Sequence, residues 1–169
     1  MSTRSKRTSI VILAAGLVAL AVAVAGCGGG GGGGGAYGAA RATTPSSGGK
    51  ASVKLASTKL GKVLVDAKGR TLYLFEADKG PMSACGGACA SVWPPLTTSG
   101  KPSAGAGVTA SKLGTTKRSD GATEVTYNGH PLYTYAGDSA PGQTSGQGLD
   151  DYGAEWYVLS AAGSKIDNG

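Results

Sequence analysis

The sequence predicts an all-β domain made of two pseudo-symmetric repeats, each with three to four short antiparallel strands, packed into one small sandwich or barrel. A ten-residue stretch, residues 69–78, recurs sixty positions later as residues 129–138, with Gly, Leu, Tyr, a second aromatic residue and Asp at matching places. Turn residues precede both copies, and no stretch of ten or more residues has helical periodicity. Because either repeat alone would leave its apolar face in water, we expect the two to pack together.

Residues 1–26 have the features of a lipoprotein signal peptide. A basic start with three Lys or Arg residues is followed by an apolar run of sixteen residues, 10–25, which is short for a bilayer span. Val24-Ala25-Gly26 then provides small residues before Cys27, as at a lipidation site. We expect cleavage before Cys27 and a lipid on its sulfur. A plain secretory signal or an uncleaved anchor helix is the alternative.

Charge and linker composition indicate where the chain works. Cleavage would remove three basic residues and no acidic ones, which lowers the formal charge from +6 to +3. So mild a charge favours no nucleic-acid partner. Residues 27–51 include eight glycines at 28–35 and predict a disordered Gly/Ser/Thr/Pro linker with a span of roughly 25–30 Å. We expect a lipid-anchored chain on the extracytoplasmic face of the cell membrane, with the membrane and an unidentified envelope component as partners.

The predicted β domain covers residues 52–163, with repeat 1 at about 52–96, repeat 2 at about 108–163 and a flexible tail at 164–169. In chain order we expect a short strand around Val53 and Leu55, then a strand at 61–66 that leads into a hairpin. A Gly/Pro/Ser-rich connector at 97–107 follows. The expected order in the second repeat is a strand at 112–118, a turn at 119–121, a strand at 123–127 and a polar loop at 142–153.

Each repeat is expected to contain a hairpin. Asn128-Gly129 is a strong signal for a type I′ turn, and Lys68-Gly69 occupies the same register in repeat 1. Strand alternation places Leu72 and Leu74 on one face and Tyr73 and Phe75 on the other; in repeat 2 it separates Leu132 and Thr134 from Tyr133 and Tyr135. A third strand is expected around Trp93 and around Trp156. The former should be short or at an edge, because Pro94 and Pro95 cannot donate to a ladder.

The recurring aromatic residues and aspartates are candidate binding residues. The aromatic pairs could line a ligand surface, or they could simply pack well on a sheet. The aspartates could ligate a cation or face an acidic site, or they could accept backbone N–H bonds and fix a turn. The candidates are Tyr73, Phe75, Asp78, Tyr133, Tyr135 and Asp138.

These residues carry a family resemblance. The segments Tyr73-Leu74-Phe75-Glu76-Ala77-Asp78 and Tyr133-Thr134-Tyr135-Ala136-Gly137-Asp138 share a Tyr-x-aromatic-x-x-Asp motif, and Cys85-Gly86-Gly87-Ala88-Cys89 precedes Trp93-Pro94-Pro95-Leu96. The chain resembles the secreted-repeat bacterial lipoproteins from about residue 60 to 159. The resemblance implies an exported tandem-repeat protein and carries no established activity.

Cysteine chemistry offers two interpretations. Of three cysteines, Cys27 is assigned to lipid, which leaves Cys85 and Cys89 as a pair outside the cytoplasm, where disulfides persist. A disulfide would staple the first repeat. Alternatively the two sulfurs, with Met82 and the single histidine, His130, could bind a soft ion such as copper or exchange disulfides.

Catalysis has little support in the sequence. There is no Gly-x-Ser-x-Gly, no phosphate-binding loop and no His-Glu-x-x-His. A serine hydrolase would have to use His130 with Ser139 or Ser145, and a paired-carboxylate hydrolase would have to use Asp78 and Asp138. A calcium site is a further alternative, formed by Asp138, Asp150, Asp151 and Glu155. We therefore expect a non-enzymatic binding or scaffold module without a cofactor, and an extracytoplasmic metal or redox protein as the alternative.

Overall fold

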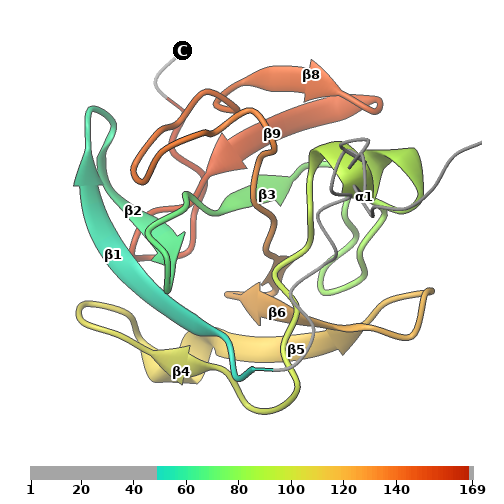
Figure 1. The fold of residues 1–169 in the computed structure, drawn as a ribbon, viewed down its shortest axis with the longest axis horizontal. Helices are drawn as coiled ribbons and strands as arrows, with labels where there is room; N and C mark the ends of the chain where they lie inside the picture. Colours follow the sequence, from blue (N-terminus) through green and yellow to red (C-terminus); the bar gives the residue numbers. More distant parts are fainter. Residues whose placement is uncertain (1–48, 168–169) are drawn as a thin grey trace, which may run out of the picture. The chain divides into compact units, whose positions relative to one another are not determined.

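A computed structural model describes residues 49–167. The expected signal peptide, Cys27 and the linker up to residue 48 lie outside the described residues. Within them the chain forms nine strands, one short α-helix and one 3-10 turn, arranged as three three-stranded sheets (Figure 1). The prediction of an all-β fold with two repeats is confirmed. Among residues 49–167 no helix is long and apolar enough to cross a membrane.

The first sheet has the order β2-β1-β4. Strands β1 (Ser52–Thr58) and β2 (Gly61–Asp66) form an antiparallel pair. The hairpin predicted at Lys68-Gly69 is a separate, short one, in which the Asp66 N–H donates to the Arg70 carbonyl and the Leu72 N–H to the Leu64 carbonyl, both at 2.9 Å. Strand β4 (Ser103–Ala104) pairs with β1 in parallel, with the Ser103 N–H donating to the Ala51 carbonyl at 2.9 Å. The predicted connector at 97–107 therefore contributes a strand. Its pairing is made mainly by backbone groups, which leave no pattern in the side chains.

The second sheet has the order β5-β6-β7 and belongs wholly to repeat 2. Strand β5 (Leu113–Lys117) pairs antiparallel with β6 (Thr123–Tyr127), which pairs with β7 (His130–Pro131). A 3-10 turn, Ala110–Lys112, precedes β5. The turn between β6 and β7 has φ of 52° at Asn128 and 86° at Gly129, as the predicted type I′ turn requires.

The third sheet joins the two repeats. Its order is β3-β9-β8, where β3 (Tyr73–Phe75) comes from repeat 1, and β8 (Leu149–Asp151) and β9 (Ala154–Val158) come from repeat 2. Both of its strand pairs are antiparallel. The predicted strand around Trp156 is therefore β9, but its partner lies in the other repeat. Strand β8 lies in the segment 142–153, which the sequence predicted as a loop.

A segment of repeat 1 also lies against repeat 2. The short helix α1 (Ala88–Val92) leads into residues 92–96, which lie along residues 132–136 of repeat 2. The Leu96 N–H donates to the Leu132 carbonyl at 2.8 Å, and the Thr134 N–H donates to the Pro94 carbonyl at 2.9 Å. The expected third strand of repeat 1 is thus reduced to a bridge at Pro95, because the prolines lack N–H donors. At the centre, Tyr73 and Tyr133 exchange two backbone hydrogen bonds of 2.8 and 3.0 Å.

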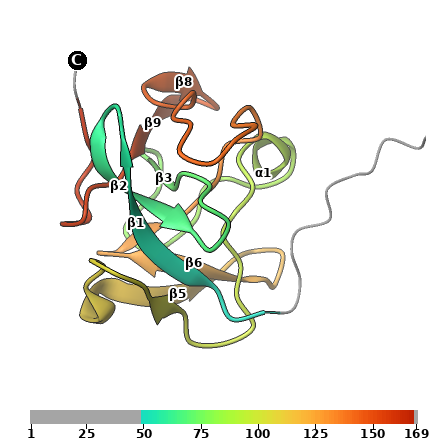
Figure 2. The same ribbon diagram turned by 60° about the vertical axis from the view of Figure 1, so that its left-hand side comes forward.

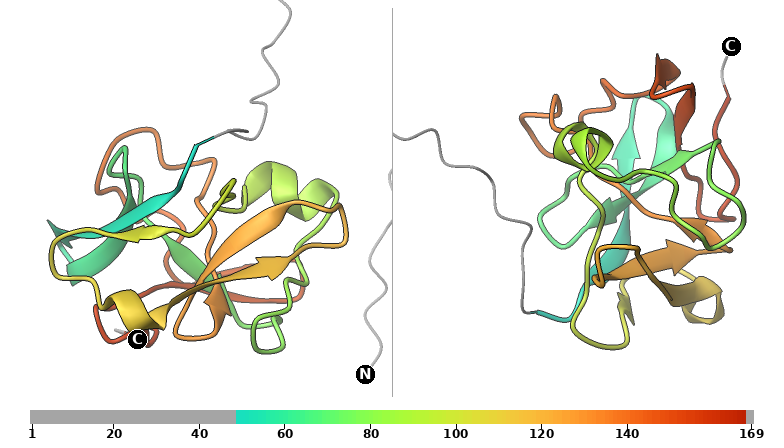
Figure 3. Two further views of the ribbon diagram at one scale, coloured as in Figure 1. Left: turned by 90° about the horizontal axis from the view of Figure 1, so that it is seen from below. Right: turned by 90° about the vertical axis from the view of Figure 1, so that its right-hand side faces the viewer.

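The sheet with β8 and β9 and the sheet with β5 and β6 lie at opposite ends of residues 49–167, with β1 and β3 between them (Figure 2). Helix α1 and the β1–β2 hairpin lie on opposite sides (Figure 3). A flexible tail was predicted at residues 164–169, but residues 165 and 166 have partners in the fold. The Ile166 N–H donates to the Val158 carbonyl at 2.9 Å, and Lys165 bridges to Leu159.

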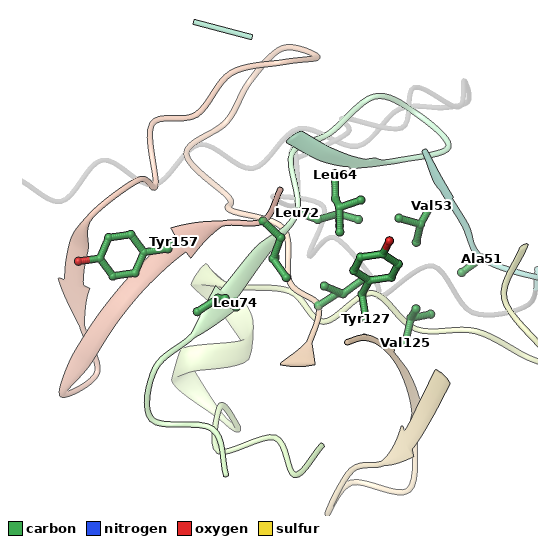
Figure 4. Packing of buried hydrophobic residues seen from close by; sticks show 10 residues of the cluster. Ala51, Val53, Leu64, Leu72, Leu74, Val125, Tyr127 and Tyr157 are labelled. Carbon is green, nitrogen blue, oxygen red and sulfur yellow. The ribbon is translucent and has the colours of Figure 1, made fainter. Parts of the chain in front are cut away.

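Two buried apolar clusters fill the interior, and strand alternation divides the residues between them. Leu72, Leu74 and Leu132 belong to the first cluster, together with Val53 and Tyr127 (Figure 4). The second cluster contains residues from the opposite strand faces together with the Cys85–Cys89 disulfide and Trp93: Val63, Val65, Tyr73, Phe75, Cys85, Cys89, Trp93, Tyr133, Trp156 and Val158. The predicted division of leucine and aromatic faces is confirmed.

Candidate functional site

The two copies of the Tyr-x-aromatic-x-x-Asp motif are bonded to each other across the repeats. The Tyr73 hydroxyl donates to Asp138 Oδ2 at 2.6 Å, and the Tyr133 hydroxyl donates to Asp78 Oδ2 at 3.0 Å. Burial raises the pKa of Tyr73, and the Asp138 carboxylate raises it further. Burial also raises the pKa of Tyr133, together with the charges of Glu124 and Asp78. Both phenols therefore stay protonated and act as donors.

Each aspartate also fixes the loop that follows it. Asp78 Oδ1 accepts the N–H of Ala84 at 2.7 Å, and Asp138 Oδ1 accepts the N–H of Ser145 at 2.9 Å. This geometry agrees with the turn-fixing interpretation of these residues. The motif thus connects a buried tyrosine of one repeat to a loop of the other.

The remaining aromatic residues form a column through the repeat interface. Phe75 stacks on Trp156 with ring centroids 4.0 Å apart, and Trp156 stacks on Trp93 at 3.9 Å. Tyr135 lies at the other end, 4.4 Å from Trp93 and tilted by 32°. Tyr73 is edge-on to Trp93, as Tyr133 is to Trp156. Except for the half-buried Tyr135 these rings are buried, so they offer no exposed aromatic face to a ligand.

Beside one of the two Tyr–Asp pairs lies a buried polar cluster, defined as Asp78, Ser83, Arg118, Glu124 and Tyr133. Arg118 donates to Glu124 Oε2 at 2.9 Å and to Ser83 Oγ at 2.6 Å. Ser83 Oγ lies 2.7 Å from the Tyr133 hydroxyl, which completes a connection to Asp78. A further bond from Arg118 reaches the Cys85 carbonyl at 2.6 Å.

Burial dominates the electrostatics of this cluster. It raises the pKa of Glu124 to about 7, although the hydrogen bond and charge of Arg118 oppose the shift. Burial also raises the pKa of Asp78 to about 6, against hydrogen bonds from Ala84 and Tyr133. Sequence reasoning missed Arg118 and Glu124. The available signal was the position of Glu124 beside Val125, in the strand that leads into the second turn.

A groove of about 540 Å³ opens next to this cluster, between segments that are distant in sequence. Its lining comes from β3 and the residues after it, from the β6–β7 turn and from the C-terminal segment: Leu74, Phe75, Glu76, Asp78, Asn128, His130, Gly163, Ser164 and Lys165. Lys165 Nζ lies 2.7 Å from Glu76 Oε1. Three predicted candidates, Phe75, Asp78 and His130, therefore meet at one place, but Phe75 is only 3% exposed.

The cysteines form the disulfide Cys85–Cys89, with Cα atoms 5.3 Å apart at the start of α1. Both are buried. Because a disulfide sulfur is not a thiolate, this state offers no thiolate ligand to copper and no free thiol for exchange. Among the described residues no three His, Cys, Asp or Glu side chains are grouped to hold a metal. His130 lies in the groove, and the Met82 side chain is 63% exposed.

The residues of the calcium and hydrolase alternatives have other contacts. Asp150 faces Glu155 across the β8–β9 pair, and Glu155 accepts the Tyr157 hydroxyl at 2.9 Å. The Ser139 hydroxyl lies 3.2 Å from Gln143 Oε1. Asp78 and Asp138 each belong to a different Tyr–Asp pair. The structure therefore does not assemble these residues into one reactive centre.

Comparison with known proteins places the two repeats in one family. Residues 54–97 and 114–160, together more than half of the 169 residues, match the family described as a secreted repeat of unknown function. Each matched segment contains one copy of the Tyr-x-aromatic-x-x-Asp motif. Neither the curated proteins nor the solved structures give a match.

Proposed function

We propose that this chain, which belongs to the family of secreted repeats of unknown function, is a membrane-anchored, non-enzymatic module that binds a component of the cell envelope. The family is a secreted one, so the chain works outside the cytoplasm. The Cys85–Cys89 disulfide agrees with that location, because disulfides persist there.

The observation that carries the proposal is the groove between the two repeats. Its lining combines polar and charged side chains, including Glu76 and Lys165, with Leu74 and Phe75, which are 4% and 3% exposed. Ligand sites commonly combine apolar walls with a few convergent polar groups. Of the aromatic column and the Tyr–Asp pairs, only Phe75 and Asp78 line the groove, and the other members hold the repeats together.

The non-enzymatic part of the proposal rests on how the reactive groups are used. Glu124 is fully buried against Arg118. The hydroxyl of Ser139 is within hydrogen-bond distance of Gln143, and Ser145 holds Asp138 through its backbone N–H. A general base must reach the proton it removes, and none of these groups is presented to the groove together with His130.

A pull-down from envelope extracts tests the binding role. The bait is the folded module carrying Glu76→Gln or His130→Ala, because these side chains line the groove without belonging to the core. The matched control is Lys101→Ala, an exposed lysine outside the groove lining. We expect the groove variants to lose an envelope component that the control retains. Equal retention by all three variants would show that the groove is not the binding site.

The membrane anchor is tested separately, through Cys27. The sequence before it, with a basic start and an apolar run, supports lipidation at this cysteine. We expect Cys27→Ala to move the protein from the membrane fraction to the soluble extracytoplasmic fraction, while Cys85→Ser leaves it with the membrane. If the Cys27→Ala variant still sediments with membranes and resists release by salt, the lipid anchor is refuted.

A further inference from the structure

The groove has more carboxylates than cations in its lining. Glu76 and Asp78 contribute two carboxylates against the single ammonium of Lys165. Glu76 is neutralised, since Lys165 Nζ lies 2.7 Å away. Asp78 has no ion-pair partner within residues 49–167. Counted with His130 neutral, the groove carries an excess of one negative charge, and that charge is on Asp78.

The nearest candidate to neutralise Asp78 is already in use. Arg118 favours the ionised form of Asp78, but its guanidinium bonds to Glu124, Asp120 and Ser83. Asp78 itself receives only dipoles, from the Tyr133 hydroxyl and the Ala84 N–H. A half-buried carboxylate satisfied by dipoles alone remains poorly compensated, because burial disfavours its charge.

We propose that the groove binds a cationic group, a primary ammonium or a guanidinium, which pairs with the Asp78 carboxylate. The inference rests on the proposed function, since it names the chemistry of the ligand that the same groove takes. The cation supplies the charge that Asp78 lacks, in a charge-assisted hydrogen bond to its carboxylate. The raised pKa of Asp78, about 6, leaves the carboxylate mostly ionised at neutral pH and therefore able to pair.

The chain provides its own matched control for Asp78. Asp138 makes the equivalent contacts, with a tyrosine hydroxyl and with the N–H of a following loop, but it is not part of the groove lining. Asp78→Asn and Asp138→Asn therefore remove the same charge from equivalent Tyr–Asp pairs. Only the first should change the groove.

The experiment is an NMR titration of the folded module with three probes of one shape and different charge: pentylamine, pentanol and pentanoate. His130 is the single histidine of the chain and lines the groove, so its ring signals report occupancy directly. We expect pentylamine to shift the His130 and groove backbone signals, with pentanol and pentanoate much weaker. Asp78→Asn should weaken pentylamine binding on the order of tenfold, the effect of losing one charge-assisted bond, and Asp138→Asn should not.

A variant that is expected to strengthen pentylamine binding keeps the test independent of folding defects, because a folding defect would weaken binding. Lys165→Met frees Glu76 from its ion pair and should tighten pentylamine binding several-fold. Equal or stronger binding of pentanol or pentanoate would overturn the cation inference and leave the groove as a binding site. Equal losses in Asp78→Asn and Asp138→Asn would also overturn it. Silence of all three probes would overturn it as well, while the envelope pull-down judges the proposed function separately.

Discussion

Substitutions of a motif Tyr and of the Asp to which it bonds in the other repeat should be energetically coupled. Substitutions of the Tyr and Asp within one copy of the motif should be additive. Tyr73 and Asp78 belong to one copy of the motif, yet the Tyr73 hydroxyl bonds to Asp138 at 2.6 Å. Tyr73→Phe removes a hydrogen bond to a charged acceptor, which stabilises proteins by about 1.5–3 kcal/mol. Because Asp138 is only half-buried, we expect the lower end of that range, and a coupling free energy between Tyr73→Phe and Asp138→Asn on the order of 1–2 kcal/mol.

The assay is a pair of double-mutant cycles on the free energy of unfolding, measured by urea denaturation at neutral pH. The raised pKa of Tyr73 keeps its hydroxyl protonated under these conditions. One cycle combines Tyr73→Phe with Asp138→Asn, and the control cycle combines it with Asp78→Asn. The control pair should be additive within about 0.5 kcal/mol. A larger coupling in the Tyr73–Asp78 cycle than in the Tyr73–Asp138 cycle would refute the exchange of partners between repeats.

Three further outcomes follow from the interior. Burial raises the pKa of Glu124 from 4.5 to about 7, so the folded chain holds a proton that the unfolded chain releases. This stabilisation is complete at low pH and is lost as pH rises through 7. From about pH 5 to about pH 8 the free energy of unfolding should fall about 2–3 kcal/mol more in wild type than in Glu124→Gln, measured by denaturant titration at each pH. Replacing Cys85 and Cys89 together by Ser should cost about 2 kcal/mol by the same method, and an unchanged denaturation midpoint would count against a stabilising disulfide. Trp93→Ala should lower the free energy of unfolding by about 3–5 kcal/mol, measured by denaturant titration, while the exposed Met82→Ala should change it by less than about 0.5 kcal/mol; similar losses would contradict the stacked core.

Local patterns were enough to predict the hairpins and the faces of their strands. Strand β2 begins at Gly61 and ends at Asp66, as the alternation before the first turn predicted. Asn128-Gly129 specified its turn because both positions need positive φ. The period of two then assigned leucines and aromatic residues to different faces, which became the two apolar clusters. All of these features depend on neighbours within a few residues.

Partner choice between the repeats could not be predicted. Both copies carry the same residues at the same spacing, so a Tyr–Asp bond within one motif and one across motifs fit the sequence equally well. Strands β4 and β8 were missed for a different reason: they are two and three residues long, and each lies in a Gly-rich segment without alternation. Tertiary pairing, rather than strand propensity, makes them strands.

The groove was predicted only in fragments. Asp78 and His130 were candidates for separate roles, and Lys165 was assigned to a flexible tail. The tail folds back because the Ile166 N–H reaches the Val158 carbonyl, which brings Lys165 beside Glu76. The lining of this groove comes from residues near 76, 130 and 165, so it depends on the complete fold and cannot be predicted from the spacing of residues within any one segment.

The places where the repeats differ indicate where function should be sought. The Leu72 N–H donates to the Leu64 carbonyl, and the equivalent Leu132 N–H donates to the Val125 carbonyl, so Leu64 and Val125 are equivalent positions. By that equivalence the buried Glu124 occupies the position of a buried Val63.

A buried ion pair adds little net stability compared with apolar packing, so the symmetric core gains nothing from this exchange. The residues that follow the two hairpin turns also differ between the repeats. Asp66 holds Arg70 at 2.8 Å in repeat 1, whereas the corresponding His130 lines the groove in repeat 2. Packing accounts for what the repeats share, and both departures from it lie around Asp78: Glu124 through Arg118, Ser83 and Tyr133, and His130 through the groove. The search for a ligand should therefore begin in the groove beside Asp78, where the two repeats differ, rather than at the buried motif tyrosines Tyr73 and Tyr133, which they have in common.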